Sequence, residues 1–184
     1  MGEDKALLRI DGSTLAARGA ALLSAVASPV FEVGPGWSTL PSVAEEAGAR
    51  GPLAAIASGA VALHPFEPLA VIVLACDMPL VTVELLQWLA DHPAPASVVP
   101  VAGEPPRPQT LCARWSRRSL DAAGGLVEAG ERSLRSLLAA TPVELVTPED
   151  WVPHAGPAGV RALDDVDTPG ELARMRALLD GWAP

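Results

Sequence analysis

Segments with apolar residues at helical spacing alternate along the chain with short apolar runs. The helical spacing predicts helices over 14–27, 51–63, 83–91, 117–129, 133–140 and 168–182. The short apolar runs predict strands over 30–33, 69–76, 96–101, 110–115, 143–146 and 160–163. Strands that alternate with helices are typical of the α/β class, and we expect a mostly parallel sheet with helices on both faces.

The residues at several predicted helix starts agree with these boundaries. Thr82 and Thr168 are suited to cap the helices that follow them, because a threonine hydroxyl accepts from free backbone N–H groups. Pro52 and Pro169 fall at first helical positions, where the fixed φ and missing donor of proline are favourable. Glu171 lies three residues after Thr168 and completes the pattern of a capping box.

The run over 69–76 ends at a carboxylate. Its continuous apolar character is typical of a strand that is buried on both faces of a parallel sheet. Asp77 follows it directly, and open α/β sheets bind ligands beyond the carboxyl ends of their strands. Because Mg²⁺ needs only one or two carboxylates when substrate phosphates supply other ligands, Asp77 is a candidate metal ligand. The alternative is that Asp77 only caps the turn before Pro79.

A second group of carboxylates follows the run over 160–163. Asp164, Asp165 and Asp167 lie within four residues and repel one another unless a cation or solvent offsets their charge. The alternative interpretation is structural, since negative charge is favourable at the start of a helix. Both interpretations stay open from the residues alone.

Composition limits the classes of function. The chain has 184 residues, 49% of them apolar, which suits one domain over residues 1–184. Its net charge of −9 argues against a nucleic-acid-binding protein, which needs a basic face. The longest strongly apolar stretch, 69–75, is too short to span a bilayer, so we expect no membrane association. With two cysteines, Cys76 and Cys112, and a charged amino terminus, we expect a cytoplasmic protein without a disulfide framework.

Several familiar nucleotide and hydrolase motifs are excluded. A P-loop needs Gly-Lys followed by Ser or Thr. The sequence has twelve arginines but a single lysine, Lys5, which is followed by Ala6. Gly34 and Gly36 lack the third glycine of a dinucleotide fingerprint, and no serine lies in Gly-x-Ser-x-Gly. Lys5 still lies close to a glycine near the amino terminus, where its ammonium could neutralise a polyphosphate as a point charge.

Six motifs in this order resemble the molybdenum cofactor guanylyltransferases, which are MobA-like nucleotidyltransferases. The similarity covers essentially the whole chain. The motifs are Met1-Gly2-Glu3-Asp4-Lys5-Ala6-Leu7-Leu8, Gly51-Pro52-Leu53-Ala54-Ala55-Ile56, Cys76-Asp77-Met78-Pro79, Arg107-Pro108-Gln109-Thr110-Leu111, Gly130-Glu131-Arg132-Ser133-Leu134 and Asp165-Val166-Asp167-Thr168-Pro169-Gly170-Glu171-Leu172.

The resemblance implies a Rossmann-like nucleotidyltransferase fold and an activity. Such enzymes move GMP from GTP to the phosphate of molybdopterin and release pyrophosphate, with Mg²⁺ as the cofactor. The implied partners are therefore GTP and molybdopterin, with a transient contact to molybdenum cofactor proteins, and neither nucleic acid nor a membrane.

The resemblance also implies roles for individual residues. Lys5 and Asp77 would be catalytic, Lys5 on the triphosphate and Asp77 on Mg²⁺. Asp165 and Asp167 would contact the acceptor, at positions where the family usually has Asn-x-Asn-Thr-Pro. Glu45 or Glu46 is the nearest match to an acidic contact with guanine. The implied nucleotide-binding set is Gly2, Lys5, Glu45, Gly51, Pro52 and Asp77.

One departure from the family concerns the first strand. Chains of the family begin with a strand of typically ~5–6 residues and a glycine-rich loop, Leu-Ala-Gly-Gly, before the Met-Gly at which this sequence begins. We expect either a start misassigned to an internal Met or a chain that binds GTP poorly, with neighbouring strands left unpaired. The alternatives are a cytidylyltransferase or another NTP transferase of the same fold, and an inactive truncated remnant that acts only as a binding module.

Overall fold

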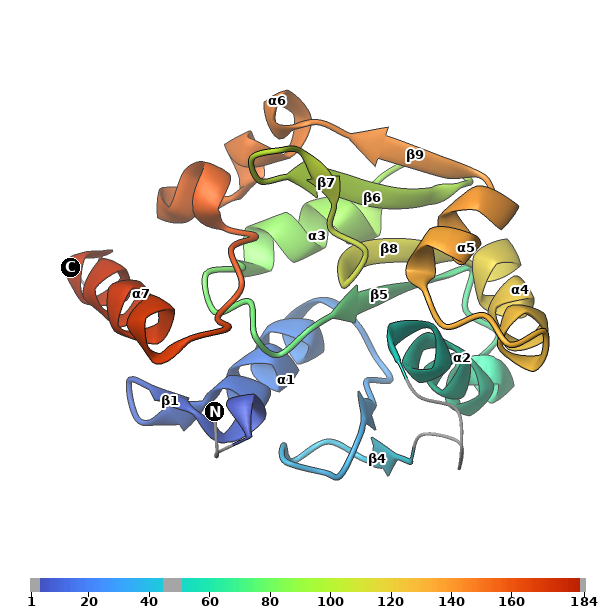
Figure 1. Ribbon diagram of the computed structural model, residues 1–184, viewed down its shortest axis with the longest axis horizontal. Helices are drawn as coiled ribbons and strands as arrows, with labels where there is room; N and C mark the ends of the chain where they lie inside the picture. Colours follow the sequence, from blue (N-terminus) through green and yellow to red (C-terminus); the bar gives the residue numbers. More distant parts are fainter. Residues whose placement is uncertain (1–3, 45–50, 183–184) are drawn as a thin grey trace.

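A mixed β-sheet forms the centre of the molecule in the computed structural model, which describes residues 4–44 and 51–182 (Figure 1). Strand β8 pairs antiparallel with β5 on one side and with β6 on the other, and β9 pairs parallel with β6. A short strand, β7, pairs antiparallel with the end of β6. The bounds are Ala70–Leu74 (β5), Ser97–Ala102 (β6), Arg107–Pro108 (β7), Cys112–Ser116 (β8) and Val143–Val146 (β9).

Helices cover both faces of this sheet. Helices α1 and α3 pack together over one face, and α2, α4 and α5 pack together over the other. Each side has its own apolar core: Leu85, Leu89 and Trp151 are fully buried in the first, and Leu53 and Trp115 in the second. The bounds are Leu15–Val26 (α1), Pro52–Leu63 (α2), Val83–Asp91 (α3), Arg117–Glu128 (α4), Leu134–Ala140 (α5), Pro148–Trp151 (α6) and Pro169–Trp182 (α7).

Smaller elements complete the described chain. Two short antiparallel strands precede α1, and a parallel pair of short strands lies between α1 and α2. Their bounds are Arg9–Ile10 (β1), Ser13–Thr14 (β2), Glu32–Val33 (β3) and Ser42–Val43 (β4). Short 3₁₀ segments cover Lys5–Leu7 (η1), His64–Phe66 (η2), Val152–His154 (η3) and Gly156–Arg161 (η4). Among the described residues, no helix is both long and apolar enough to cross a membrane.

The α/β class and all six predicted helices are confirmed, each helix to within one residue at either end. The expected strand over 160–163 is wrong, because residues up to Arg161 form η4. Gly156 and Gly159 adopt positive φ values of 60° and 54°, which bend this segment away from an extended path. Its buried residues Ala158 and Ala162 are spaced as on a helix rather than alternating as on a strand.

Two further expectations about the sheet need correction. The sheet is mixed rather than mostly parallel, because β8 runs antiparallel to both of its neighbours. The strand expected to be buried on both faces, β5, has all five residues only half-buried. Within the described residues β5 pairs with β8 on one edge and with no strand on the other, which leaves one side of it open.

Candidate active site

The candidate site lies just beyond the carboxyl end of β5. Asp77 comes shortly after Leu74, the last residue of this strand, and is half-buried. The backbone N–H of Val166 donates to the carbonyl oxygen of Asp77 at 2.9 Å. This bond holds the loop that carries Asp165 and Asp167 against the end of β5, although the two segments are far apart in the sequence.

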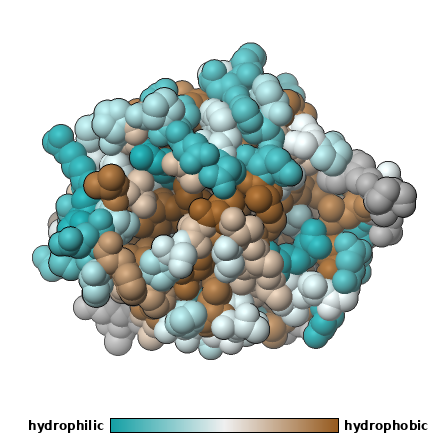
Figure 2. Space-filling model, turned by 180° about the vertical axis from the view of Figure 1, so that it is seen from behind, coloured by the Kyte–Doolittle hydropathy of each residue, from teal (hydrophilic) through white to brown (hydrophobic). Residues whose placement is uncertain are grey.

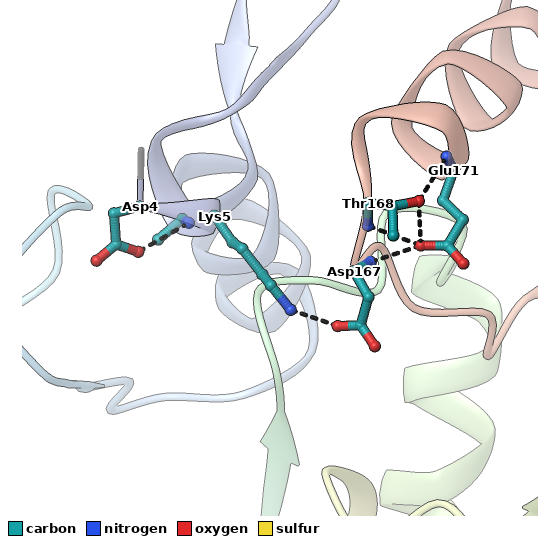
Figure 3. A network of polar contacts seen from close by, with 6 residues as sticks. Asp4, Lys5, Asp167, Thr168 and Glu171 are labelled. Atoms are coloured by element: carbon teal, nitrogen blue, oxygen red, sulfur yellow. Dashed lines mark hydrogen bonds and ion pairs between the residues drawn. The ribbon is translucent and has the colours of Figure 1, made fainter. Parts of the chain in front are cut away.

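Lys5 reaches the same place from the first described turn. It begins η1, whose start is capped by the Asp4 carboxylate, which accepts from the backbone N–H of Ala6 at 3.3 Å. The Lys5 ammonium donates to a carboxylate oxygen of Asp167, so the first turn and the loop before α7 meet (Figure 3). This hydrogen bond, helped by the charges of Asp77 and Asp165, raises the pKa of Lys5 above its usual range.

The loop before α7 is held by the capping box that the sequence predicts. A carboxylate oxygen of Glu171 accepts from the backbone N–H groups of Asp167 at 3.0 Å and Thr168 at 2.7 Å (Figure 3). The Thr168 hydroxyl oxygen accepts in return from the backbone N–H of Glu171 at 3.2 Å. The box therefore fixes the direction in which Asp167 faces Lys5. A second contact also joins the amino-terminal segment to α7: Arg176 donates from Nε to the carbonyl oxygen of Arg9 at 3.0 Å.

The electrostatics at Asp77 favour a cation. Burial raises the pKa of the Asp77 carboxyl above its usual range, and the negative charge of Asp165 raises it further, while Lys5 lowers it. Three carboxylates, Asp77, Asp165 and Asp167, thus share one ammonium group. A divalent metal ion would offset the remaining negative charge.

The residues present fit a magnesium ion of the kind that phosphate substrates bring with them. Within the described residues, no group of three or more His, Cys, Asp or Glu side chains lies close enough to form a protein cage for a metal. Mg²⁺ does not need such a cage, because it is usually bound by one or two carboxylates together with substrate phosphates and water. Asp77, with Asp165 nearby, provides this kind of donor set.

Neither cysteine has the properties of a nucleophile. Burial, together with the charge of Asp77, raises the pKa of Cys76 to about 11. Burial alone raises the pKa of Cys112, which lies in the sheet. Both thiols stay protonated at neutral pH, so the site offers phosphate and metal binding rather than thiol chemistry.

Two more of the predicted nucleotide-binding residues, Gly51 and Pro52, lie at the start of α2. Pro52 lines the same groove as Asp77. Gly51 has a φ of 111°, and a side chain added there would meet the carbonyl oxygen of Arg132 at 3.3 Å, so a glycine is required. Gly2, Glu45 and Glu46 lie outside the described residues.

Sequence reasoning missed a small polar pocket beside Asp165. It has a volume of about 220 Å³ and is lined by Arg161, Asp164, Asp165, Glu171, Arg174 and Met175. Arg161 is held by Asp164 at 2.9 Å, so Arg174 is the arginine of this pocket that an anionic ligand could approach. The spacing of Glu171, Arg174 and Met175 on one helix face is the signal that could have indicated a shared surface.

Comparison of the sequence with models of known protein families identifies the family of this chain. Residues 1–148 match the family model described as the MobA-like NTP transferase domain. The chain belongs to this family. The matched range includes Asp77, which follows β5, and ends before Asp165 and Asp167.

Solved structures of similar fold agree with the family. One is the crystal structure of molybdopterin-guanine dinucleotide biosynthesis protein A from Archaeoglobus fulgidus, with a TM-score of 0.74 and 18% identity over 98% of this chain and 92% of that chain. Another is 2-C-methyl-D-erythritol 4-phosphate cytidylyltransferase from Thermus thermophilus, with a TM-score of 0.67 and 20% identity over 97% of this chain and 95% of that chain. At this identity the likeness shows the fold alone. No curated protein matches the sequence.

Proposed function

We propose that this MobA-like protein transfers GMP from GTP to molybdopterin and releases pyrophosphate. The observation that carries the proposal is the meeting of Lys5 with Asp77, Asp165 and Asp167 beyond the carboxyl end of β5. The structural likeness to a molybdopterin-guanine dinucleotide biosynthesis protein supports the choice of base and acceptor. The nucleotidyl transfer itself is the chemistry of the family.

In this proposal the protein brings two polyanions together. A phosphate oxygen of the acceptor attacks the α-phosphorus of GTP in line, and the bond to the β-phosphate oxygen breaks. Lys5 binds the triphosphate and favours the departure of pyrophosphate, because its ammonium offsets the charge that develops there. Asp77, with Asp165 beside it, would hold Mg²⁺, which supplies Lewis-acid stabilisation of the reacting phosphate oxygens when bound.

In this proposal the ion pair between Lys5 and Asp167 couples the binding of the triphosphate to the binding of the acceptor. Asp167 is exposed and Lys5 is partly exposed, so an anion from solvent can replace Asp167 as the partner of Lys5. An incoming triphosphate competes with Asp167 for Lys5. Asp167 is then free to accept hydrogen bonds from the acceptor, while the Thr168–Glu171 box keeps its backbone in place.

A second candidate is cytidylyl transfer. The fold likeness to a cytidylyltransferase, with a TM-score of 0.67, favours it. Both candidates use the same phosphate and metal chemistry at Lys5 and Asp77, so they differ only in the base and the acceptor.

Thermal unfolding in the presence of nucleotides tests the proposal. With Mg²⁺ present, GTP should raise the melting temperature more than CTP or ATP, by mass action on the folded state. Transfer should then be followed as pyrophosphate release from GTP with molybdopterin as acceptor, with Asp77→Asn as the inactive control. Better protection by CTP would favour the cytidylyl candidate. Protection by none of the nucleotides, even for a chain extended at its amino terminus, would favour a binding module.

A further inference from the structure

Trp37 is a large apolar side chain that lies outside both apolar cores of the described chain. By contrast, Trp115 and Trp151 are fully buried in these cores, and their indole N–H groups donate to backbone carbonyl oxygens at 3.2 and 3.1 Å. Trp37 is only half-buried. Packing in the interior of the fold therefore does not account for this indole.

One carboxylate holds the loop that carries Trp37. An oxygen of the Glu32 carboxylate accepts from the backbone N–H groups of Gly36 at 2.9 Å and Trp37 at 2.7 Å, and its other oxygen accepts from that of Ser38 at 2.7 Å. Burial acts to raise the pKa of Glu32, but hydrogen bonds from the side chain of Ser38 and from these N–H groups outweigh it and hold the pKa below its usual range. The charged carboxylate therefore fixes the backbone of Trp37 at neutral pH.

The loop is also closed at its two ends. Strands β3 and β4 pair in parallel on either side of it, with Glu32 opposite Ser42. The backbone N–H of Glu32 donates to the carbonyl oxygen of Pro41 at 2.9 Å. Gly36 has a φ of 85°, and a side chain added there would meet the hydroxyl oxygen of Ser42 at 3.3 Å, so the turn requires a glycine. The segment between the two strands is thus a tight loop that presents Trp37 in a fixed position.

Trp37 lines a groove that extends to the candidate active site. The groove has a volume of about 760 Å³, and Asp77, Ala6 and Pro52 also line it. Apolar side chains gather around a hollow on the face seen in Figure 2. Ala6 belongs to η1, which also carries Lys5. The groove therefore reaches the element that holds the proposed ligand of the triphosphate.

The groove and the small polar pocket beside Asp165 are separate and share no lining residue. The charge of Glu32 acts on Cys76, which lines the groove directly before Asp77. The charge of Asp165, which lines the polar pocket, acts on Asp77 itself. Two recesses thus lie within reach of Asp77, and a transfer reaction has two substrates to place. The groove, with its mostly apolar lining, suits the base of a nucleotide.

The geometry points to a stacking contact. We propose that the indole of Trp37 stacks on the base of the bound nucleoside triphosphate and that Glu32 is the positioning residue that holds Trp37 in the groove. Any base can stack on an aromatic face, and a purine, with two fused rings, covers more of an indole than a pyrimidine does. Trp37 thus favours GTP over CTP without a hydrogen bond to the base. This inference rests on the proposed binding of a nucleoside triphosphate at Lys5 and Asp77.

Titration with two phosphate compounds tests the role of Trp37. Isothermal titration with GTP and Mg²⁺ is compared with titration with inorganic tripolyphosphate and Mg²⁺, which offers the phosphates without a base. Trp37→Ala should weaken GTP binding roughly 10- to 100-fold, the effect of losing one stacking contact, weaken CTP binding less, and leave tripolyphosphate binding unchanged. Trp37→Phe should retain most of the GTP affinity. Trp37→Leu keeps apolar bulk without an aromatic face and should behave like Trp37→Ala, even where the loop needs a large side chain to fold.

Trp88→Ala is the matched control. Trp88 is also half-buried, but its ring packs against His92 and His154 and does not line the groove. Its loss should leave the affinities for GTP and tripolyphosphate unchanged.

A double-mutant cycle tests the positioning role of Glu32. Glu32→Gln keeps the shape of the side chain and loses the charge to which the three N–H groups donate. It should weaken GTP binding in the unsubstituted protein and have no further effect in Trp37→Ala, where the stacking contact is already lost. An equal loss in both backgrounds overturns the positioning role.

The outcomes separate this inference from the proposed function. Strong GTP binding that is the same in Trp37→Leu as in the unsubstituted protein overturns the stacking contact and leaves the proposed function standing. Equal losses of GTP and tripolyphosphate affinity in Trp37→Leu also overturn it, because the indole would then act on the phosphates or on the fold. Failure of the unsubstituted protein to bind GTP overturns both.

Discussion

Val166 donates its backbone N–H to the carbonyl oxygen of Asp77 at 2.9 Å, and this bond ties the two acidic segments of the site together. Val166 is fully buried, with its side chain in the core that α1 and α3 share. Asp165 and Asp167 flank it on the exposed side of the loop. The buried valine and its hydrogen bond therefore set the distance between the metal-binding carboxylate and the acceptor-binding carboxylates in our proposal.

Removing this hydrogen bond should impair the acceptor step. Val166→Pro lacks the N–H, while Val166→Ala keeps it and loses similar apolar bulk. We expect Val166→Pro to be less stable than Val166→Ala by roughly 0.5–1.5 kcal/mol, the value of one intramolecular hydrogen bond. Its KM for the acceptor should also rise more than that of Val166→Ala. Chemical denaturation and steady-state kinetics of the two variants measure both effects, and identical values would show that the bond is unimportant.

Asp77→Asn should lower the transfer activity without lowering the stability of the fold. Loss of the carboxylate should lower Mg²⁺-dependent transfer by roughly 10²–10³-fold, the usual effect of losing a charge-stabilising group in a site. The fold should be kept or stabilised at pH 7, because the raised pKa of Asp77 shows that its charged form is disfavoured in the folded protein. Transfer assays and thermal unfolding without metal measure the two effects.

The pH dependence of this stability difference has a definite sign. A folded pKa above the ordinary value means that the protonated form of Asp77 stabilises the fold at low pH, and that this contribution is lost as the pH rises through the raised pKa. The advantage of Asp77→Asn should therefore shrink as the pH falls from 7 through that value. Mg²⁺ should raise the melting temperature of the unsubstituted protein and leave Asp77→Asn unchanged. A metal effect of equal size in both would remove Asp77 from the metal site.

Lys5→Ala should weaken triphosphate binding by about 1–3 kcal/mol, the range for a charge-assisted hydrogen bond. Lys5→Arg keeps the charge and should restore most of the affinity. Asp167→Asn gives the complementary test. It removes the carboxylate that competes with the nucleotide for Lys5, so it should strengthen nucleotide binding. Isothermal titration with GTP and Mg²⁺ measures all three. Unchanged affinity in Lys5→Ala would make Lys5 a purely structural partner of Asp167.

Thr168→Ala should loosen the start of α7 and lower the free energy of unfolding by roughly 0.5–2 kcal/mol, as for other helix caps. Thr168→Ser keeps the hydroxyl and serves as the control. Hydrogen bonds from Thr168 and from the backbone N–H of Asp167 lower the pKa of Glu171, so its contribution to stability is lost as the pH falls through that lowered value. Denaturation of both variants at neutral and acid pH measures this. No difference between Ala and Ser would mean that packing alone holds α7.

Local patterns were sufficient to predict much of the fold. The helices over 83–91 and 168–182 carry their caps in the sequence, and Thr82 and Thr168 accept the bonds that the sequence predicts. Asp77 could be found because a continuous apolar run stops directly before it. The segment around Gly159 could not, since its apolar residues permit a strand and only the two positive φ values and the packing of Ala158 and Ala162 decide for a 3₁₀ turn.

Contacts between distant segments could not be predicted from the residues alone. Nothing near Asp77 indicates that Val166 bonds to it, and nothing near Lys5 indicates Asp167. The resemblance to MobA-like proteins named these residues together, and the structure supplies the geometry that joins them. The antiparallel pairing of β8 with β5 and β6 was missed for the same reason, because strand direction depends on partners that a local pattern does not contain.

The ion pair between Lys5 and Asp167 joins residues 162 positions apart, and the bond from Arg176 to Arg9 spans 167. Closing so long a loop of chain has an entropic cost, which the burial of Val166, Leu172 and Met175 offsets only after the rest of the core has formed. The centre of the molecule should therefore assemble during synthesis well before these contacts form. The site becomes complete only once α7 has left the ribosome, and on heating it should be the first part of the protein to come apart.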